Sequence, residues 1–159
     1  MIVVSDTSPI TNLLRIGRIG LLRDLFETVI IPQAVYREVA FLEDQRIAIA
    51  EFDWIRTMPV KNIRLVDQLL LTLDRGEAEA IALSVELSAK VLLIDEAAGR
   101  NEAERLGLEV TGLLGVLIRA KEKGLIPKVE PEIQKLLTDA RFWLSEELIQ
   151  AVLTKIGEK

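Results

Sequence analysis

The pattern of apolar and polar residues alternates between short apolar runs and longer stretches with helical spacing. The clearest run covers residues 91–94 (VLLI) and is followed at once by Asp95 and Glu96. A short run without polar alternation is typical of a strand buried on both faces of a parallel sheet. The chain begins in the same way, since residues 2–5 (IVVS) lead into Asp6. We therefore predict two buried strands, each followed by an acid at its carboxyl end.

The rest of the chain alternates between expected strands and helices. Further short strands are predicted over residues 28–31, 54–58 and 109–111. Helices are predicted over residues 7–25 with a break near Gly17 and Gly20, and over residues 32–42, 66–73, 77–87, 96–106, 112–123, 131–140 and 146–156. This order predicts an α/β fold with a small parallel sheet. We expect residues 1–127 to form one domain, on which residues 128–159 pack as a helical extension.

Composition limits the cellular setting. Half of the 159 residues are hydrophobic, which is enough for one core. No segment approaches the roughly 18 uninterrupted apolar residues of a membrane helix. The apolar amino terminus has no basic leader, so a secretory signal is not expected. Because cysteine is absent as well, we expect a cytoplasmic protein with no membrane partner.

The absence of both histidine and cysteine limits the chemistry. It excludes Ser-His-Asp triads, thiolate catalysis and zinc sites built from imidazole or thiolate ligands. Any metal must be held by oxygen, which favours Mg²⁺ or Mn²⁺. The net charge of −5 argues against a protein that coats nucleic acid with a basic surface. It does not argue against a nuclease, in which acids hold cations that face the phosphates.

Acidic residues stand where a parallel sheet places its ligand sites. Asp6 and Asp95 follow strands whose carboxyl ends share one edge. Glu77 is expected to open a helix, and Glu38 lies close to the apolar face of another. Carboxylates brought together repel one another, and a divalent cation relieves that repulsion. One or two such ions can activate a water for phosphodiester cleavage without a side-chain base.

Each acid also has a plain structural explanation. Asp6 or Asp95 could cap the helix that follows it. Glu77 and Glu79 could complement the dipole of their helix, and Glu38 could be solvated. Taken singly, these explanations are at least as good as a functional one, but they are less convincing for the set. Which of Glu77 and Glu79 belongs to the set stays open.

At this point the residues carry a family resemblance. Over roughly the first 120 residues, the order and spacing of four segments resemble the motifs of PIN-domain nucleases. The segments are residues 2–10 (IVVSDTSPI), 31–39 (IPQAVYREV), 74–83 (DRGEAEAIAL) and 92–96 (LLIDE). The resemblance implies a three-layer sandwich in which helices flank a small parallel sheet. It also implies Mg²⁺- or Mn²⁺-dependent RNA cleavage, with the acids of these motifs as catalytic residues and metal ligands: Asp6, Glu38, Glu77 and Asp95.

Many PIN proteins dimerise, and many are toxins of the VapC type that a small antitoxin neutralises. This chain departs from the commonest toxin pattern, because its third acid is a glutamate after Gly76 and Asp95-Glu96 is followed by Arg100. It also carries two further C-terminal helices. It therefore resembles a less-characterised PIN subgroup. The alternative is a PIN-like nucleic-acid-binding or regulatory module without useful catalysis, which the complete set of acids disfavours.

Two residues are candidates for substrate binding. Arg100 lies one helical turn beyond Glu96 and is placed to contact a phosphate. Its alternative is an ion pair within the helix, to Glu96 or Glu104. Ser8 could orient Asp6 or bind substrate, although a helix cap is its simpler role. Both tryptophans, at positions 54 and 143, are expected to pack in the core rather than stack on bases.

The last two predicted helices carry more apolar residues than a short domain easily covers. We expect part of this surface to make a homodimer, which static light scattering at about tens of micromolar protein would detect. A monomer at that concentration would contradict the expectation. The residues concerned are Leu136, Leu137, Trp143, Leu144, Leu148, Ile149, Val152 and Ile156.

Overall fold

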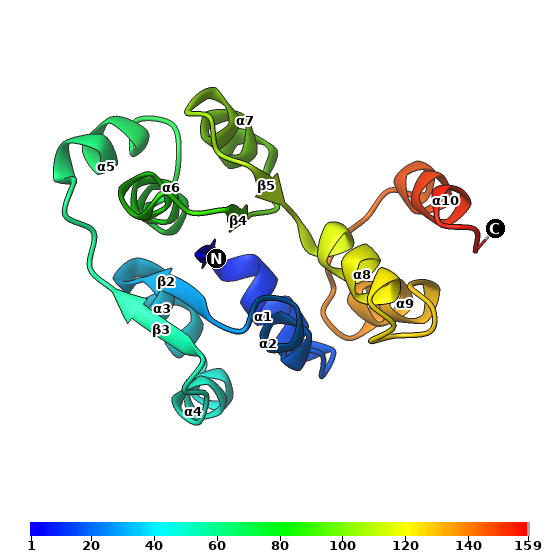
Figure 1. Ribbon diagram of the computed structural model, residues 1–159. Helices are drawn as coiled ribbons and strands as arrows, with labels where there is room; N and C mark the ends of the chain where they lie inside the picture. The colour runs from blue at the N-terminus through cyan, green and yellow to red at the C-terminus, as the bar shows by residue number, and fades with distance from the viewer. Residues whose placement is uncertain (159) are drawn as a thin grey trace.

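The computed structural model describes residues 1–158, which contain a parallel sheet of five strands in the order β3-β2-β1-β4-β5. Figure 1 shows the sheet between layers of helices. The strands are β1 (Val3–Ser5), β2 (Val29–Pro32), β3 (Ile55–Met58), β4 (Val91–Leu93) and β5 (Val110–Thr111). The helices are α1 (Thr7–Arg15), α2 (Gly20–Phe26), α3 (Gln33–Ala40), α4 (Glu43–Ala50), α5 (Ile63–Leu69), α6 (Arg75–Leu87), α7 (Ala97–Arg105), α8 (Leu113–Glu122), α9 (Glu130–Thr138) and α10 (Glu146–Lys155).

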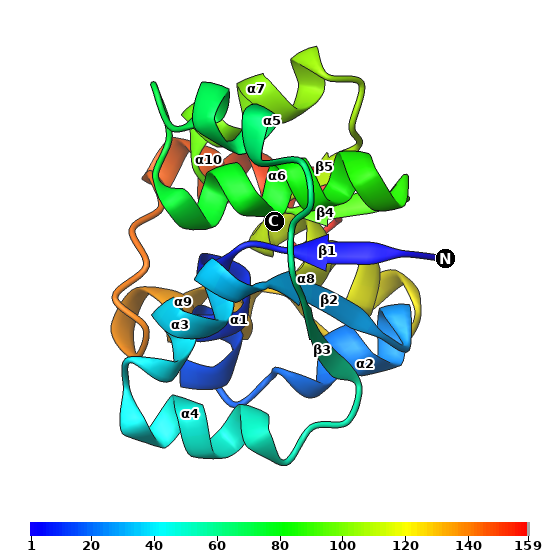
Figure 2. The ribbon, with the colours of Figure 1, turned by 90° about the vertical axis from the view of Figure 1, so that its left-hand side faces the viewer.

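The central strands are buried on both faces, as their continuous apolar runs predicted. Successive strand residues alternate between two cores: Val3 and Leu93 join one, and Val4 and Leu92 join the other. The first core is covered by α1, α2 and α8, and the second by α5, α6 and α7, as Figures 1 and 2 show. This arrangement confirms the predicted α/β sandwich, in which helices flank a small parallel sheet.

Some predicted boundaries are wrong. The helix expected to open at Glu77 is α6 and begins at Arg75, because Asp74 caps it. The Asp74 carboxylate accepts a hydrogen bond from the Glu77 N–H at 2.8 Å, and Glu77 Oε1 accepts one from the Asp74 N–H at 3.2 Å. This reciprocal pair is a capping box. Likewise, Pro32 was expected to open a helix but is the last residue of β2, with an extended backbone.

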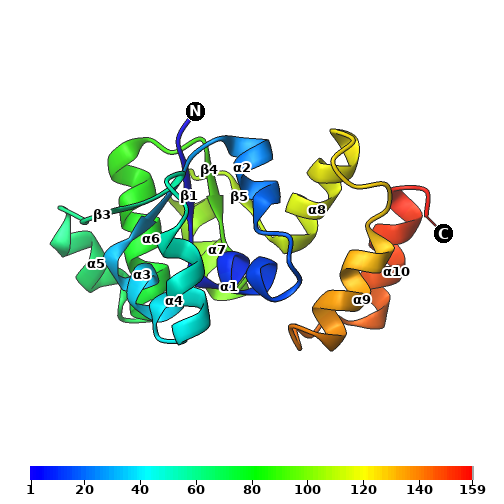
Figure 3. The same ribbon diagram turned by 90° about the horizontal axis from the view of Figure 1, so that it is seen from below.

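The C-terminal helices pack on the first core (Figure 3). Ile133, Leu136, Ile149 and Leu153 are buried there. The Glu158 carboxylate accepts hydrogen bonds from backbone N–H groups at the start of α9 and from Lys121 at the end of α8. The final residue of the predicted extension, at position 159, lies outside the described residues.

The two tryptophans behave differently. Trp54 is buried against Phe52, with ring centroids 5.3 Å apart, as predicted. Trp143 is 81% exposed in the segment between α9 and α10, so the expectation that it packs in the core is wrong. Within residues 1–158, every helix falls short of the length and hydrophobicity that a membrane span requires.

A buried ion pair joins α9 to the turn between α1 and α2. The Arg18 guanidinium donates to both oxygens of Glu132, at 2.9 and 3.1 Å, and the Glu132 side chain is only 4% exposed. Arg18→Ala leaves that carboxylate without its main partner, so we expect a loss of about 2 kcal/mol in the free energy of unfolding, measured by urea denaturation. Lys135→Ala is the matched control, because Lys135 lies 3.8 Å from Glu132 but is half exposed, and it should cost less than about 1 kcal/mol. Equal losses for the two variants would contradict a specific role for Arg18.

Candidate active site

Asp6 lies at the carboxyl end of β1, next to β4. Its N–H donates to the Leu93 carbonyl at 2.9 Å, which extends the pairing of the two strands. The residue is only 4% exposed. It occupies the N-cap position of α1, but within residues 1–158 its side chain makes no capping hydrogen bond. A cap is therefore not the role of this carboxylate.

Other acids surround Asp6. The pKa of Asp6 is raised to about 7, mainly by burial and in smaller part by the neighbouring carboxylates of Asp74, Glu77 and Glu38. A backbone hydrogen bond at Thr7 acts in the opposite direction. The chain thus brings acids from the end of β1, from α3 and from the start of α6 into one electrostatic cluster.

Glu38 is fixed from two sides. It is exposed on α3, and its Oε2 accepts a hydrogen bond of 2.5 Å from the Thr7 hydroxyl. A Cβ atom at Gly76 would lie 2.6 Å from Glu38 Oε1. A larger residue at position 76 would displace the Glu38 carboxylate from this place beside the first turn of α6.

Glu77 and Glu79 point to different neighbours. Glu77 is 7% exposed, and burial raises its pKa, with further contributions from Asp74 and Glu96. Glu79 Oε1 instead accepts a hydrogen bond from the Ala34 N–H at 3.1 Å, at the start of α3. The structure therefore brings Glu77 to Asp6 and uses Glu79 to hold α3 on α6.

Asp95 follows β4 and is held in a fixed orientation. Its Oδ1 accepts from the Leu113 N–H at 2.8 Å, and its Oδ2 accepts from the Ser8 hydroxyl at 3.1 Å. Burial raises the pKa of Asp95, while these two hydrogen bonds and the charge of Arg100 lower it. Asp95 therefore caps α8 rather than the helix that follows it. A Cβ at Gly112 would lie 2.7 Å from Asp95 Oδ1, so a larger residue there would displace the Asp95 carboxylate.

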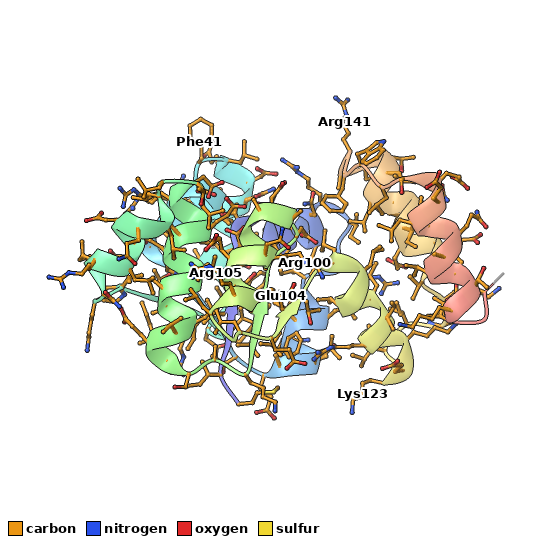
Figure 4. The ribbon with its side chains drawn as sticks, turned by 90° about the horizontal axis from the view of Figure 1, so that it is seen from above. Phe41, Arg100, Glu104, Arg105, Lys123 and Arg141 are labelled. Atoms are coloured by element: carbon orange, nitrogen blue, oxygen red, sulfur yellow. The ribbon has the colours of Figure 1, made fainter. Side chains whose placement is uncertain are left out.

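The two predicted substrate contacts lie beside Asp95. Ser8 orients Asp95 rather than Asp6, and it also accepts a hydrogen bond from Asn12 at 3.0 Å. Arg100 Nη1 approaches Gly112, between α7 and α8 (Figure 4). Among the described residues it forms no ion pair with Glu96 or Glu104. Its charge therefore faces the Asp95 side of the site.

Asp74 and Thr7 were missed by the sequence analysis. Asp74 falls between the predicted helices 66–73 and 77–87, although Asp-x-x-Glu at positions 74–77 is the signal of a capping box. As the cap of α6, Asp74 adds another carboxylate beside Asp6. Thr7 had no signal of its own, because its partner Glu38 lies on another helix.

The donors of this cluster fit a hard divalent cation. They are carboxylate oxygens, which suit Mg²⁺ or Mn²⁺. No three of the acids in residues 1–158 are arranged so that they could hold one ion together. Magnesium usually takes one or two carboxylates and completes its shell with waters and substrate phosphate. The arrangement therefore fits an ion bound by one or two of these side chains.

The sequence model of a family described as PIN domain matches residues 2–158, which includes α9 and α10. No curated protein matches the chain.

The raised pKa of Asp6 predicts how the metal-free protein responds to pH. Between pH 3.8 and about 7 the folded state holds a proton on Asp6 that the unfolded chain has released, so stability falls as the pH rises through this window. Asp6→Asn removes the cost of ionising the buried group. In a buffer with chelator at pH values above 7, we expect this variant to melt at a higher temperature than the wild type. Its free energy of unfolding should be greater by an amount on the order of a few kcal/mol. The gain should shrink as the pH falls toward 3.8.

Asp24→Asn serves as the control, because Asp24 is an exposed acid on α2. It should leave the melting temperature nearly unchanged at every pH. If Asp6→Asn instead lowers the melting temperature above pH 7, Asp6 stabilises the metal-free fold and the repulsive cluster is refuted.

Proposed function

Because the chain belongs to the PIN domain family, whose members are generally nucleases, we propose that it is a metal-dependent endoribonuclease that hydrolyses RNA phosphodiester bonds. The observation that carries the proposal is the burial of Asp6 beside three other carboxylates, with its pKa raised to about 7. Such a cluster is unfavourable unless a cation neutralises it. It lies at the carboxyl edge of the sheet, where open α/β folds bind their ligands.

In this proposal Asp6, Glu38, Glu77 and Asp95 are the catalytic acids and metal ligands, with one or two of them on each Mg²⁺ or Mn²⁺ ion. When bound, the ion supplies a water activated for attack and stabilises charge on the phosphate. Other groups of the chain hold the proposed ligand side chains in position. Ser8 and the first N–H of α8 fix Asp95, which keeps one carboxylate turned to the edge of the sheet.

The remaining groups act on the substrate and on neighbouring acids. Thr7 holds Glu38. Arg100, which has no ion-pair partner among the described residues, is placed to accept a substrate phosphate near Asp95. The second candidate function, a nucleic-acid-binding module without catalysis, is favoured by one observation. The acids of residues 1–158 are not drawn together around a single ion.

We also propose a homodimer in the cytoplasm. Much of the apolar surface expected to self-associate is buried within the protomer, but Trp143 and Leu148 are 81% and 44% exposed. They line one cleft of about 730 Å³ that also includes Asp95 and Arg100, so a second copy that covered Trp143 and Leu148 would lie beside the proposed substrate contacts. A toxin role extends the proposal, and a small antitoxin encoded beside the gene would support it.

The catalytic assignment is tested by cleavage of single-stranded RNA in Mg²⁺ or Mn²⁺. Removing a residue that orients a metal ligand typically costs 10- to 100-fold, so removing a ligand should cost at least about 100-fold. We expect this for both Asp6→Asn and Asp95→Asn. Glu96→Gln is the matched control, because Glu96 is exposed beside Asp95, and it should cost less than about tenfold.

Two results would change the proposal. If Glu96→Gln inactivates the protein and Asp95→Asn does not, the wrong acid has been assigned at the end of β4. If the unmodified chain binds RNA but does not cleave it in either metal, the binding module is the better description.

A further inference from the structure

A cleft of about 420 Å³ lies between α3 and the start of α6, beside the acid cluster. It is lined by Ala34, Arg37, Glu38, Phe41 and Arg75. Glu38 belongs to both the cleft and the acid cluster, so the two are continuous. A group bound in the cleft would therefore lie next to the proposed catalytic acids.

A buried acid organises the basic side of this cleft. Glu79 Oε2 lies 3.5 Å from Arg75 Nη1 and 4.0 Å from Arg37 Nη2, while its other oxygen holds the Ala34 N–H. Two guanidinium groups thus share one buried carboxylate, and the other acid of the cleft, Glu38, is engaged by the Thr7 hydroxyl. The Arg37 side chain is 61% exposed and the Arg75 side chain 56%, so further N–H groups of both are open to solvent. This is the chemistry of an anion site for phosphate.

An exposed aromatic ring stands on the same side. Phe41 is 86% exposed and projects from the edge of the molecule, as Figure 4 shows. It lies four residues after Arg37, so the two side chains leave the same face at the end of α3. An accessible ring beside paired arginines suits an unpaired base and its phosphate, because every base presents a π-face for stacking.

We propose that this cleft is a nucleotide subsite for single-stranded RNA, in which Phe41 stacks on a base and Arg37 and Arg75 bind a phosphodiester. Glu79 is the positioning residue that sets the two arginines. This inference rests on the proposed function, which identifies the ligand as RNA. It adds the direction from which the RNA strand approaches the acids. The strand passes the α3 side and reaches the acids at Glu38.

The experiment measures binding of a short fluorescent single-stranded RNA by anisotropy over a range of salt concentrations. The background variant Asp6→Asn prevents cleavage of the probe. Phe41→Ala should weaken binding by about fivefold or more. Leu71→Ala is its control, because Leu71 is an equally exposed apolar residue outside the cleft and should have little effect.

The arginines are tested by the salt dependence. Arg37→Ala and Arg75→Ala should each weaken binding and reduce the slope of log affinity against log salt by about 0.7, the value for one phosphate contact on a single strand. Arg105→Ala, an exposed arginine of α7 paired with Glu102, should change neither. Glu79→Gln should also weaken binding, although it removes a negative charge. If Glu79 acted only by neutralising the two arginines, Glu79→Gln would bind the RNA more tightly.

The outcomes separate this inference from the proposed function. If the unmodified chain cleaves RNA but the cleft variants bind the probe with unchanged affinity and slope, the subsite is refuted and the nuclease stands. If the chain does not cleave RNA but Phe41→Ala and the arginine variants weaken binding as stated, the subsite stands and the nuclease fails. If Phe41→Ala changes only the oligomeric state in light scattering, the cleft is a protein contact and the inference is overturned.

Discussion

The repulsion among carboxylates around Asp6 is the constraint on which the rest of the site depends. Parallel pairing of β1 with β4 fixes the Asp6 backbone through the Leu93 carbonyl and leaves its side chain buried at the sheet edge. Asp74 and Glu77 are then brought in by the capping box that starts α6. Burial and the nearby carboxylates together make the ionised form of Asp6 unfavourable, and its side chain makes no capping hydrogen bond within residues 1–158 that would offset this.

Glycines at three positions let the surrounding elements close on these acids. A side chain at Gly76 would collide with Glu38, and one at Gly112 would collide with Asp95. At Gly99, a Cβ would lie 2.6 Å from Ile94 and 3.3 Å from a Glu77 oxygen. In each case the close atom belongs to a side chain, so a larger residue would displace Glu38, Ile94 or Asp95 from its present position.

The sequence predicted the parts of the site that depend on local pattern. Asp6 and Asp95 follow apolar runs, and parallel strands place such residues at one edge whatever the rest of the chain does. Glu77 and Glu79 could not be separated, because both lie near the start of α6 and differ only in which neighbour they face. That choice depends on how α3 packs against α6, which leaves Glu79 with the Ala34 N–H.

The partners of Ser8 and Arg100 could not be predicted from the sequence either. Both depend on how Asp95 and the start of α8 pack beside these residues. Trp143 was assigned to the core from its apolar character, but no element of the protomer covers it within residues 1–158. Periodicity describes the face of a helix, and Trp143 lies in the segment between two helices. The five strands along the chain, with helices between them, by contrast followed from hydrophobic spacing and were confirmed.

The most direct test of the metal site compares thermal melts with and without Mn²⁺. Mn²⁺ should stabilise the wild-type protein, by about 2.7 kcal/mol at a hundredfold excess over the dissociation constant. Asp6→Asn should lose most of this gain, whereas Glu79→Gln should keep it, because Glu79 is a buried acid that binds Ala34 and the arginines instead. If Asp6→Asn gains as much from Mn²⁺ as the wild type does, Asp6 is not a metal ligand, and the proposed nuclease mechanism fails with it.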